Sequence, residues 1–340
     1  MRVAWPIICA FLALPACVLP AAADDRQTLP AASAAQAAPT GARFLLQIDA
    51  SGLVSAQVEQ LWDDVRRMLR AETIPLSGTV DVLPKGVQLR IPLDTARARA
   101  MAKLQELAQT SSNIPGVANT VAYIPADGDA GQVTVTLTDD EITRNAQRTV
   151  EQSIAMLRRR IGLLGMAGAV VQRQGHDNIL AEVPGVKNQQ RFLDLILNPG
   201  ILEFRLVAEK DAVAADFDLL LERADKNKIP VLKQAVISAD DLVDAQPGLD
   251  PLSSAPIIKF RFNSRGRQQL AAVTTENVGR VLAIVLNGEV VSAPRIMEPI
   301  TGGWGQISGQ FTVTETNDMA MLMRSGALPA KLTVIERSGP

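Results

Sequence analysis

The fold is decided by residues 149–207, which read TVEQSIAMLRRRIGLLGMAGAVVQRQGHDNILAEVPGVKNQQRFLDLILNPGILEFRLV. The stretch opens inside a helix pattern whose apolar residues recur every three or four positions and therefore share one face. That face consists of Ile142, Ala146, Val150, Ile154, Leu157, Ile161 and Leu164. Strand patterns follow at 169–173, 179–183 and 201–207, with a second helix pattern at 188–197. Together with an alternating strand at 132–137, they predict a βαββαβ unit, the split arrangement of ferredoxin-like folds.

An earlier part of the chain repeats this order of elements with little sequence identity. Strand patterns occur at 43–48, 79–83, 87–91 and 117–124, and helix patterns at 54–69 and 95–109. The first helix has an apolar face made of Val54, Val58, Leu61, Val65 and Leu69. We therefore predict an α+β protein with tandem ferredoxin-like βαββαβ units.

The last part of the chain predicts an inserted α+β head domain. Residues 208–250 are charged and irregular. Strand patterns then follow at 257–262, 281–286 and 289–291, and helix patterns begin at Asn263 and Thr312. The Asn287-Gly288 pair is a strong hairpin signal. A late strand at 331–336 is expected to return to the sheet of the second unit, because that unit is complete before the excursion begins.

These patterns divide the chain into five parts. They are a signal peptide or N-terminal anchor at 1–23, a flexible linker at 24–41, an N-terminal βαββαβ subdomain at 42–130, a base at 131–210 completed by 328–340, and a head at 211–327. The first part has one positive charge, an apolar run and then Ala21-Ala22-Ala23, which favours a cleaved signal peptide. The run is long enough to leave an uncleaved anchor open, and Leu14–Cys17 loosely resembles a lipobox, which leaves a lipoprotein open.

Composition excludes several classes of function. The chain is 47% hydrophobic and 21% charged, as globular proteins are, and its net charge of -2 does not indicate a nucleic-acid partner. Cys9 and Cys17 are the only cysteines, so cleavage after Ala23 would leave a protein without disulfides or thiolate chemistry.

Several motifs resemble those of the SecD family, an accessory membrane subunit of the bacterial Sec export machinery. They are VVQRQG at 170–175, LEFRLV at 202–207, AIVLNGEVVSAP at 283–294, SGALPA at 325–330 and KLTVIER at 331–337. The resemblance covers about residues 130–337 in sequence and 43–125 in pattern only. It implies a periplasmic base and an inserted head, the head being the region that contacts exported polypeptide.

The chain also departs from the SecD pattern. The family has a glycine-rich motif after its first membrane helix, whereas this chain has Pro39-Thr40-Gly41-Ala42 there. The family's later membrane helices carry the charged residues associated with proton coupling. No later apolar run in this chain reaches the length needed to span a bilayer. We therefore expect no proton coupling by the chain itself.

No group of residues predicts an active site, a cofactor or a metal site. His176, the only histidine, lies in a hairpin turn beside Asp177 with no nucleophile nearby. The glycines of Gly302–Gly305 are not followed by the Lys-Ser/Thr of a phosphate loop and are interpreted as a turn. The sequence therefore predicts a protein that is not an enzyme.

Three charged or soft clusters are interpreted structurally. Asp139-Asp140-Glu141 follows Thr138 as a capping box at a helix N-terminus, which explains these acids without a metal. Arg158-Arg159-Arg160 is interpreted as favourable charge near a helix C-terminus. Met319, Met321 and Met323 are interpreted mainly as core rather than as an adaptable binding patch.

The preferred function is a non-enzymatic periplasmic protein that assists Sec-dependent translocation by binding unfolded polypeptide through its head. The candidate contact residues are Ile296, Met297, Trp304 and Ile307, whose alternative role is ordinary head core. The Sec translocon or the SecD–SecF membrane proteins are further candidate partners. A secreted adaptor that binds the SecD–SecF complex or another envelope protein through a fixed interface remains the alternative. A hydrolase on the same fold and a truncated relic of SecD also stay open.

Overall fold

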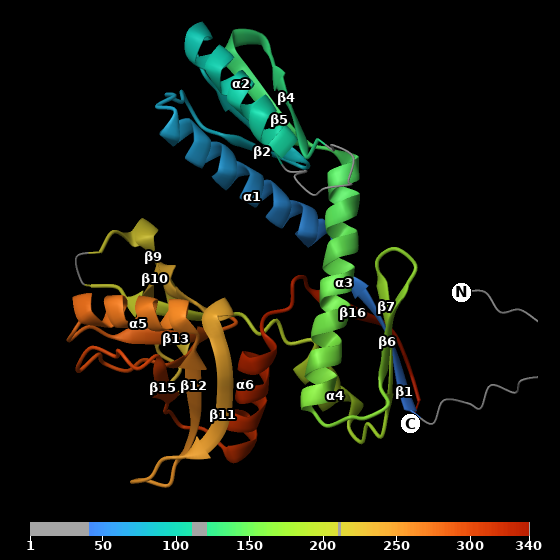
Figure 1. The fold of residues 1–340 in the computed structure, drawn as a ribbon, viewed down its shortest axis with the longest axis vertical. Helices are drawn as coiled ribbons and strands as arrows, with labels where there is room; N and C mark the ends of the chain where they lie inside the picture. The colour runs from blue at the N-terminus through green and yellow to red at the C-terminus, as the bar shows by residue number, and fades with distance from the viewer. Residues whose placement is uncertain (1–40, 111–120, 210–211, 340) are drawn as a thin grey trace, which may run out of the picture. The chain divides into compact units, whose positions relative to one another are not determined.

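The computed structural model describes residues 41–110, 121–209 and 212–339, so the expected signal peptide or anchor and most of the linker lie outside the described residues. Six α-helices and sixteen strands form three open sheets and one closed barrel within these ranges (Figure 1). The predicted α+β class is confirmed. None of the helices in these ranges combines the length and apolarity required to cross a bilayer. Short 3-10 segments lie at Asp129–Gly131, Ala214–Asp216 and Ala239–Asp241.

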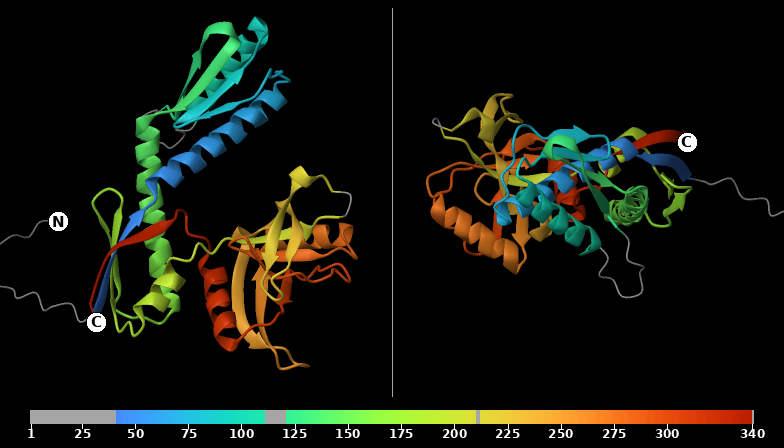
Figure 2. Two further views of the ribbon diagram at one scale, coloured as in Figure 1. Left: turned by 180° about the vertical axis from the view of Figure 1, so that it is seen from behind. Right: turned by 90° about the horizontal axis from the view of Figure 1, so that it is seen from above.

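The base sheet has the order β16-β1-β7-β6, and all its neighbouring strands are antiparallel. Its strands are β1 (Gly41–Ile48), β6 (Val170–Gln174), β7 (Asn178–Pro184) and β16 (Leu332–Ser338). Helices α3 (Asp139–Leu163) and α4 (Gln189–Ile196) share the core of this sheet, where Phe44 stacks on Phe192 with ring centroids 5.5 Å apart. As predicted, the last strand returns here, and Figure 2 shows β1 and β16 side by side.

The N-terminal sheet has the order β2-β3-β5-β4. Its strands are β2 (Asp81–Leu83), β3 (Gly86–Arg90), β4 (Tyr123–Asp127) and β5 (Gln132–Leu137), and its helices are α1 (Ala50–Ala71) and α2 (Asp94–Thr110). The Asp49 side chain caps α1 by accepting from the Gly52 amide at 3.0 Å. The buried face of α1 contains Val58, Leu61, Val65 and Leu69, as the sequence period predicts.

Two predicted sets of strand partners are wrong. The sequence order places residues 43–48 in one βαββαβ unit with 79–83, 87–91 and 117–124, but β1 pairs with β7 and β16. It likewise places 132–137 in the base, but β5 pairs with β3 and β4. Alternation identifies a strand and its buried face but not its partner, and sequential strands are neighbours in only about two-thirds of cases.

The resulting base is still a βαββαβ set, assembled from distant segments. In chain order it uses β1, α3, β6, β7, α4 and β16, with the N-terminal elements inserted after β1 and the head inserted after α4. The strand predicted to close the base, β8 (Leu202–Val207), belongs to the head instead. Helix α3 links the parts, because Ile142 packs in the N-terminal core, Leu157 in the base core and Leu163 against the head core.

The head combines a closed barrel with a three-stranded sheet. The barrel has the order β10-β8-β13-β14-β9 and consists of β8, β9 (Phe217–Glu222), β10 (Lys228–Ser238), β13 (Leu282–Leu286) and β14 (Glu289–Ser292). The sheet has the order β11-β12-β15 and consists of β11 (Leu242–Leu249), β12 (Pro256–Phe262) and β15 (Trp304–Ile307). Helices α5 (Ser264–Glu276) and α6 (Val313–Ser325) complete it. The head segment expected to be irregular, 208–250, therefore contains β9, β10 and β11.

Local signals in the head are confirmed. Asn287 and Gly288 have φ of 54° and 80°, the left-handed pair that the tight β13–β14 hairpin requires. Asn263 caps α5 by accepting from the Gly266 amide at 2.9 Å. Met319 and Met323 are buried in the head core together with Met321, as the core interpretation predicts.

Helix α6 begins with a capping box. The Thr312 hydroxyl accepts from the Glu315 amide at 3.2 Å, and the Glu315 carboxylate accepts from the Thr312 amide at 2.8 Å and hydroxyl at 2.9 Å. The hydrogen bond from the Thr312 backbone amide is the main cause that lowers the pKa of the Glu315 carboxyl. Because that pKa is lower in the folded protein, its stabilising effect is present above the unfolded carboxyl's pKa and is lost as the pH falls through the folded value.

We expect Thr312→Ala to lower the free energy of unfolding by about 1 kcal/mol at neutral pH. Glu315→Gln should flatten the loss of stability below about pH 4, where the carboxyl would otherwise take up its proton. Urea unfolding at neutral and acidic pH measures both effects. Thr314→Ala, an exposed threonine in the same turn, is the control, and an equal loss in this control would contradict the role of the cap.

Candidate functional site

The free edge of the three-stranded head sheet carries the first candidate residues. β15 pairs with β12 in the register Arg261↔Trp304 and Lys259↔Gln306, and no described strand pairs with its other edge. Because directly opposite residues point to the same face, Trp304 shares an exposed face with Arg261 and Lys259. The opposite face is buried and carries Ile258, Phe260 and Ile307.

The four residues predicted from the sequence do not form one surface. Ile296 and Ile307 are only 4% and 1% exposed and belong to the head core. Ile307 lies opposite Ile258 on the inner face of the sheet, and the Ile296 amide and carbonyl bond to Arg280 and Gly279. Burial prevents either side chain from meeting a partner in this conformation. Met297 and Trp304, in contrast, are 78% and 67% exposed.

A third exposed apolar residue, Leu252, was not predicted. It lies in the β11–β12 turn and is 98% exposed. The Asp250 carboxylate holds this turn by accepting from the Leu252 and Ser253 amides at 3.0 and 2.9 Å, and these bonds lower its pKa. Gln306 of β15 reaches the same carboxylate at 3.3 Å. The signal available in the sequence was a leucine inside the polar turn Asp250–Ser253. Leu252 lies beyond the Pro256 end of β12, whereas Trp304 is opposite Arg261 near the other end, so we define the head surface as Trp304 and Met297 only.

Gly303, next to Trp304, is required by the backbone conformation and by close packing. Gly303 has φ of 72°, and a Cβ there would lie 2.7 Å from the Cβ of Arg267. A side chain at this position would therefore be strained and would collide with α5. The carbonyl of Gly303 accepts from the Phe262 amide at 2.8 Å, which anchors the loop to β12. The predicted turn at Gly302–Gly305 is therefore correct only for Gly302 and Gly303, because Trp304 and Gly305 belong to β15.

The other polar candidates also have structural partners. His176 lies in the β6–β7 turn, where its carbonyl accepts from Arg173 at 3.2 Å. The Thr138 hydroxyl accepts from the Glu141 amide at 3.2 Å, and Asp139 pairs with Lys85 at 2.7 Å. Across the described part of the chain, no group of three histidine, cysteine or acidic side chains is arranged to hold a metal ion.

Arg160 departs from its predicted role at a helix C-terminus. Its side chain is completely buried, whereas Arg158 and Arg159 are exposed. The guanidinium donates to neutral oxygens of two segments, the carbonyls of Ile196, Asn198, Pro199 and Gly326 and the hydroxyl of Ser325. Burial lowers the pKa of Arg160 to about 10, so it remains charged at neutral pH.

Asn198, Pro199 and Gly326, three of the residues bonded to Arg160, belong to the two connections between the base and the head, and Ile196 and Ser325 are the helix residues just before these connections. We call these the crossing segments: residues 197–201 join α4 to β8, and residues 326–331 join α6 to β16. Gly200 has φ of 69°, and a Cβ there would lie 2.6 Å from a terminal nitrogen of Arg160. The crossing segments therefore pack closely against the Arg160 guanidinium, and a side chain at Gly200 would displace it. The position of Arg160 three residues after Leu157, on the apolar face of α3, is the sequence signal that could have revealed it.

Comparisons with known proteins agree with the sequence resemblance. One family model, the P1 head subdomain of SecDF, matches residues 217–330, and another, the N-terminal part of the P1 domain of protein translocase subunit SecDF, matches residues 150–209. Protein translocase subunit SecD of Rhodobacter capsulatus is 34% identical over 304 residues, which cover 87% of this chain and 54% of that protein. SecD of Rickettsia bellii is 31% identical over 303 residues, covering 87% and 56%.

The chain thus spans about half the length of the curated relatives it matches. A similar solved structure is described as "Structure and function of a membrane component SecDF that enhances protein export". It is 31% identical, with a TM-score of 0.48, and covers 56% of this chain and 92% of the solved one.

Proposed function

Because this chain belongs to the SecD family through its P1 region, we propose that it assists Sec-dependent protein export as a non-enzymatic periplasmic component. In this proposal it binds unfolded exported polypeptide through the head surface. Its other partners would be the Sec translocon or the SecD–SecF membrane proteins. Binding is passive, and any proton-driven step belongs to a membrane partner rather than to this chain.

The observation that carries the proposal is the free edge of β15 with its exposed tryptophan. A strand edge offers backbone donors and acceptors to any extended chain, whatever its sequence. Trp304 adds a large apolar area, and tryptophan is frequent among residues that dominate binding energy. Met297 adds an unbranched, adaptable side chain suited to varied partners. Such contacts support affinities near the micromolar range, about -8 kcal/mol.

The test compares the full chain with a variant carrying Met297→Ser and Trp304→Ser. Wild type should bind a reduced, unfolded model protein in preference to its folded form, with or without chelator or ATP. The double variant should bind at least about tenfold more weakly, since truncating an anchoring tryptophan typically costs 2 kcal/mol or more. Fluorescence anisotropy measures the binding, and thermal unfolding should be nearly unchanged because both side chains are exposed.

The matched control replaces two exposed apolar residues of the N-terminal sheet, Val82→Ser and Ile124→Ser. This control should bind like wild type. An equal loss would mean that general surface apolarity, not the head surface, holds the polypeptide. If wild type shows no preference for the unfolded form at tens of micromolar, the alternative of an adaptor with a fixed interface becomes the better account.

A further inference from the structure

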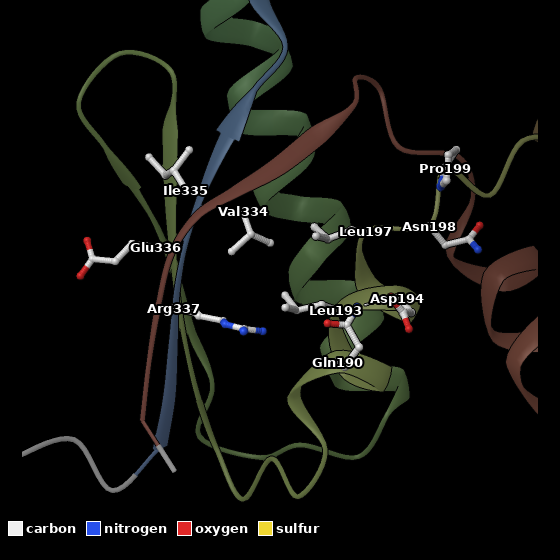
Figure 3. A pocket seen from close by; sticks show the side chains of 10 residues that line it. All are labelled: Gln190, Leu193, Asp194, Leu197, Asn198, Pro199, Val334, Ile335, Glu336 and Arg337. Atoms are coloured by element: carbon white, nitrogen blue, oxygen red, sulfur yellow. Dashed lines mark hydrogen bonds between the residues drawn. The ribbon is translucent and has the colours of Figure 1, made fainter.

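A groove of about 620 Å³ lies in the base between α4 and the edge strand β16 (Figure 3). Its apolar lining includes Leu193, which is buried, and Leu197 and Val334, which are half-buried. Gln190 and Asp194 lie on α4 at its polar rim. This groove shares no residue with the head surface. A volume of this size is typical of sites that hold a ligand rather than a few waters.

One wall of the groove is an unpaired strand edge. β16 pairs with β1 on one side, and no described strand pairs with its other side. The register shifts between Val334 and Glu336, so Ile335 forms a bulge and regular backbone lies on either side of it. Backbone donors and acceptors along the outer edge can therefore pair with another extended chain.

The side chains of β16 divide between the two faces of the sheet. Figure 3 shows Val334 and Arg337 pointing toward α4, and Ile335 and Glu336 pointing away from it. Val334 and Arg337 share a face although they are three residues apart, because Ile335 forms the bulge, whereas a regular strand added to β16 would alternate with a period of two. Every second side chain of that strand would then enter the groove and meet Leu193, Leu197 and Val334.

The charges of the groove favour a carboxylate on its occupant. Arg337 is exposed, and none of the ion pairs among the described residues involves it. Asp194 is engaged by the Gln190 amide at 2.8 Å, and Glu336 faces the other side of the sheet. Arg337 is therefore the cation available to an acidic residue in the groove.

We propose that the base carries a second polypeptide-binding site, in which an extended segment adds to β16 as a fifth strand. An apolar side chain of that segment lies between α4 and Val334, and an acidic side chain pairs with Arg337. An unpaired strand edge beside an apolar groove recognises an extended backbone and not a folded surface or a small molecule. The site goes beyond the proposed function, because it does not involve the head surface.

The probe is a fluorescently labelled eight-residue peptide of alternating Val and Thr with one Glu. Its twin is N-methylated at alternate residues, which removes the amide donors of one edge and keeps every side chain. With the full chain, the first peptide should bind in anisotropy titrations, and the methylated twin should bind at least about tenfold more weakly. Equal binding of the two peptides would overturn strand addition.

Variants of the groove locate the binding. Val334→Asp and Arg337→Glu should each weaken peptide binding several-fold. Arg337→Glu changes only an exposed side chain, so it still tests the site if Val334→Asp fails to fold. Val170→Asp on β6, the opposite edge of the same sheet, is the matched control and should bind like wild type. An equal loss in Val170→Asp would overturn the assignment to β16.

Three further measurements distinguish strand addition at β16 from binding at the head, from self-association and from occupation by the linker. In the background of the Met297→Ser, Trp304→Ser variant, which weakens the head surface, Val334→Asp should still weaken peptide binding several-fold. If Val334→Asp has no effect in that background, the peptide binds at the head instead. If sedimentation of the wild-type protein alone shows a dimer, and Val334→Asp makes it monomeric, a second copy of this chain occupies β16 and the polypeptide proposal is wrong.

Deletion of residues 24–40 should leave peptide binding unchanged. Tighter peptide binding after this deletion would mean that the linker segment occupies the groove.

Discussion

Replacing Arg160 by methionine is expected to lower the free energy of unfolding by about 3–5 kcal/mol. Methionine fills much of the same volume but donates no hydrogen bond. The buried carbonyl of Ile196 and the partly buried carbonyls of Asn198 and Gly326 would then lose their present donor. Burying the charge of Arg160 is costly, but the guanidinium N–H groups donate hydrogen bonds to carbonyls of both crossing segments at the same time. Urea unfolding of the full chain measures the change.

The control for this variant is Arg159→Met, one residue earlier on the same helix. Arg159 is exposed, so its replacement should change stability by no more than about 0.5 kcal/mol. Arg160→Lys should fall between the two, since one ammonium reaches fewer acceptors than a guanidinium. Limited proteolysis of Arg160→Met should show new cleavage in the crossing segments. A stability within about 1 kcal/mol of wild type would mean that water replaces the arginine without cost.

The elements that could be predicted from the sequence are those fixed by local rules. The apolar face of α3, the Thr312 cap of α6 and the Asn287-Gly288 hairpin each depend on residues a few positions apart. Strand partners depend on distant parts of the chain. β1 joins β7 across more than a hundred intervening residues, and no local pattern specifies that pairing.

The candidate site shows the same limit at the level of single residues. Ile296 and Met297 are adjacent and similarly apolar, yet one is buried and the other exposed. Trp304 and Ile307 are three positions apart, so in a strand they must point to opposite faces. Interpreting this segment as a turn concealed that alternation. A strand assignment for residues 304–307 would have separated Trp304 from Ile307 by the period of two alone.

Removing residues 331–340 is expected to destabilise the base strongly while sparing the head. The truncation deletes β16, exposes the edge of β1 and takes Leu332 out of the base core. Loss of one buried leucine side chain typically costs 2–5 kcal/mol, and the lost backbone pairs add to this. We therefore expect the free energy of opening the base to fall by at least about 4 kcal/mol.

Hydrogen exchange followed by region measures this effect, because each part of the chain reports its own opening. Amides of β1 and β7 should exchange much faster in the truncated chain, whereas those of β12 should be little changed, since the head has its own core around Phe204, Phe260 and Phe262. Removing only residues 339–340 leaves β16 intact and is the control. Unchanged protection of β7 in the truncated chain would show that β16 lies on the base without supporting it, and equal loss in β12 would show that base and head unfold as one unit.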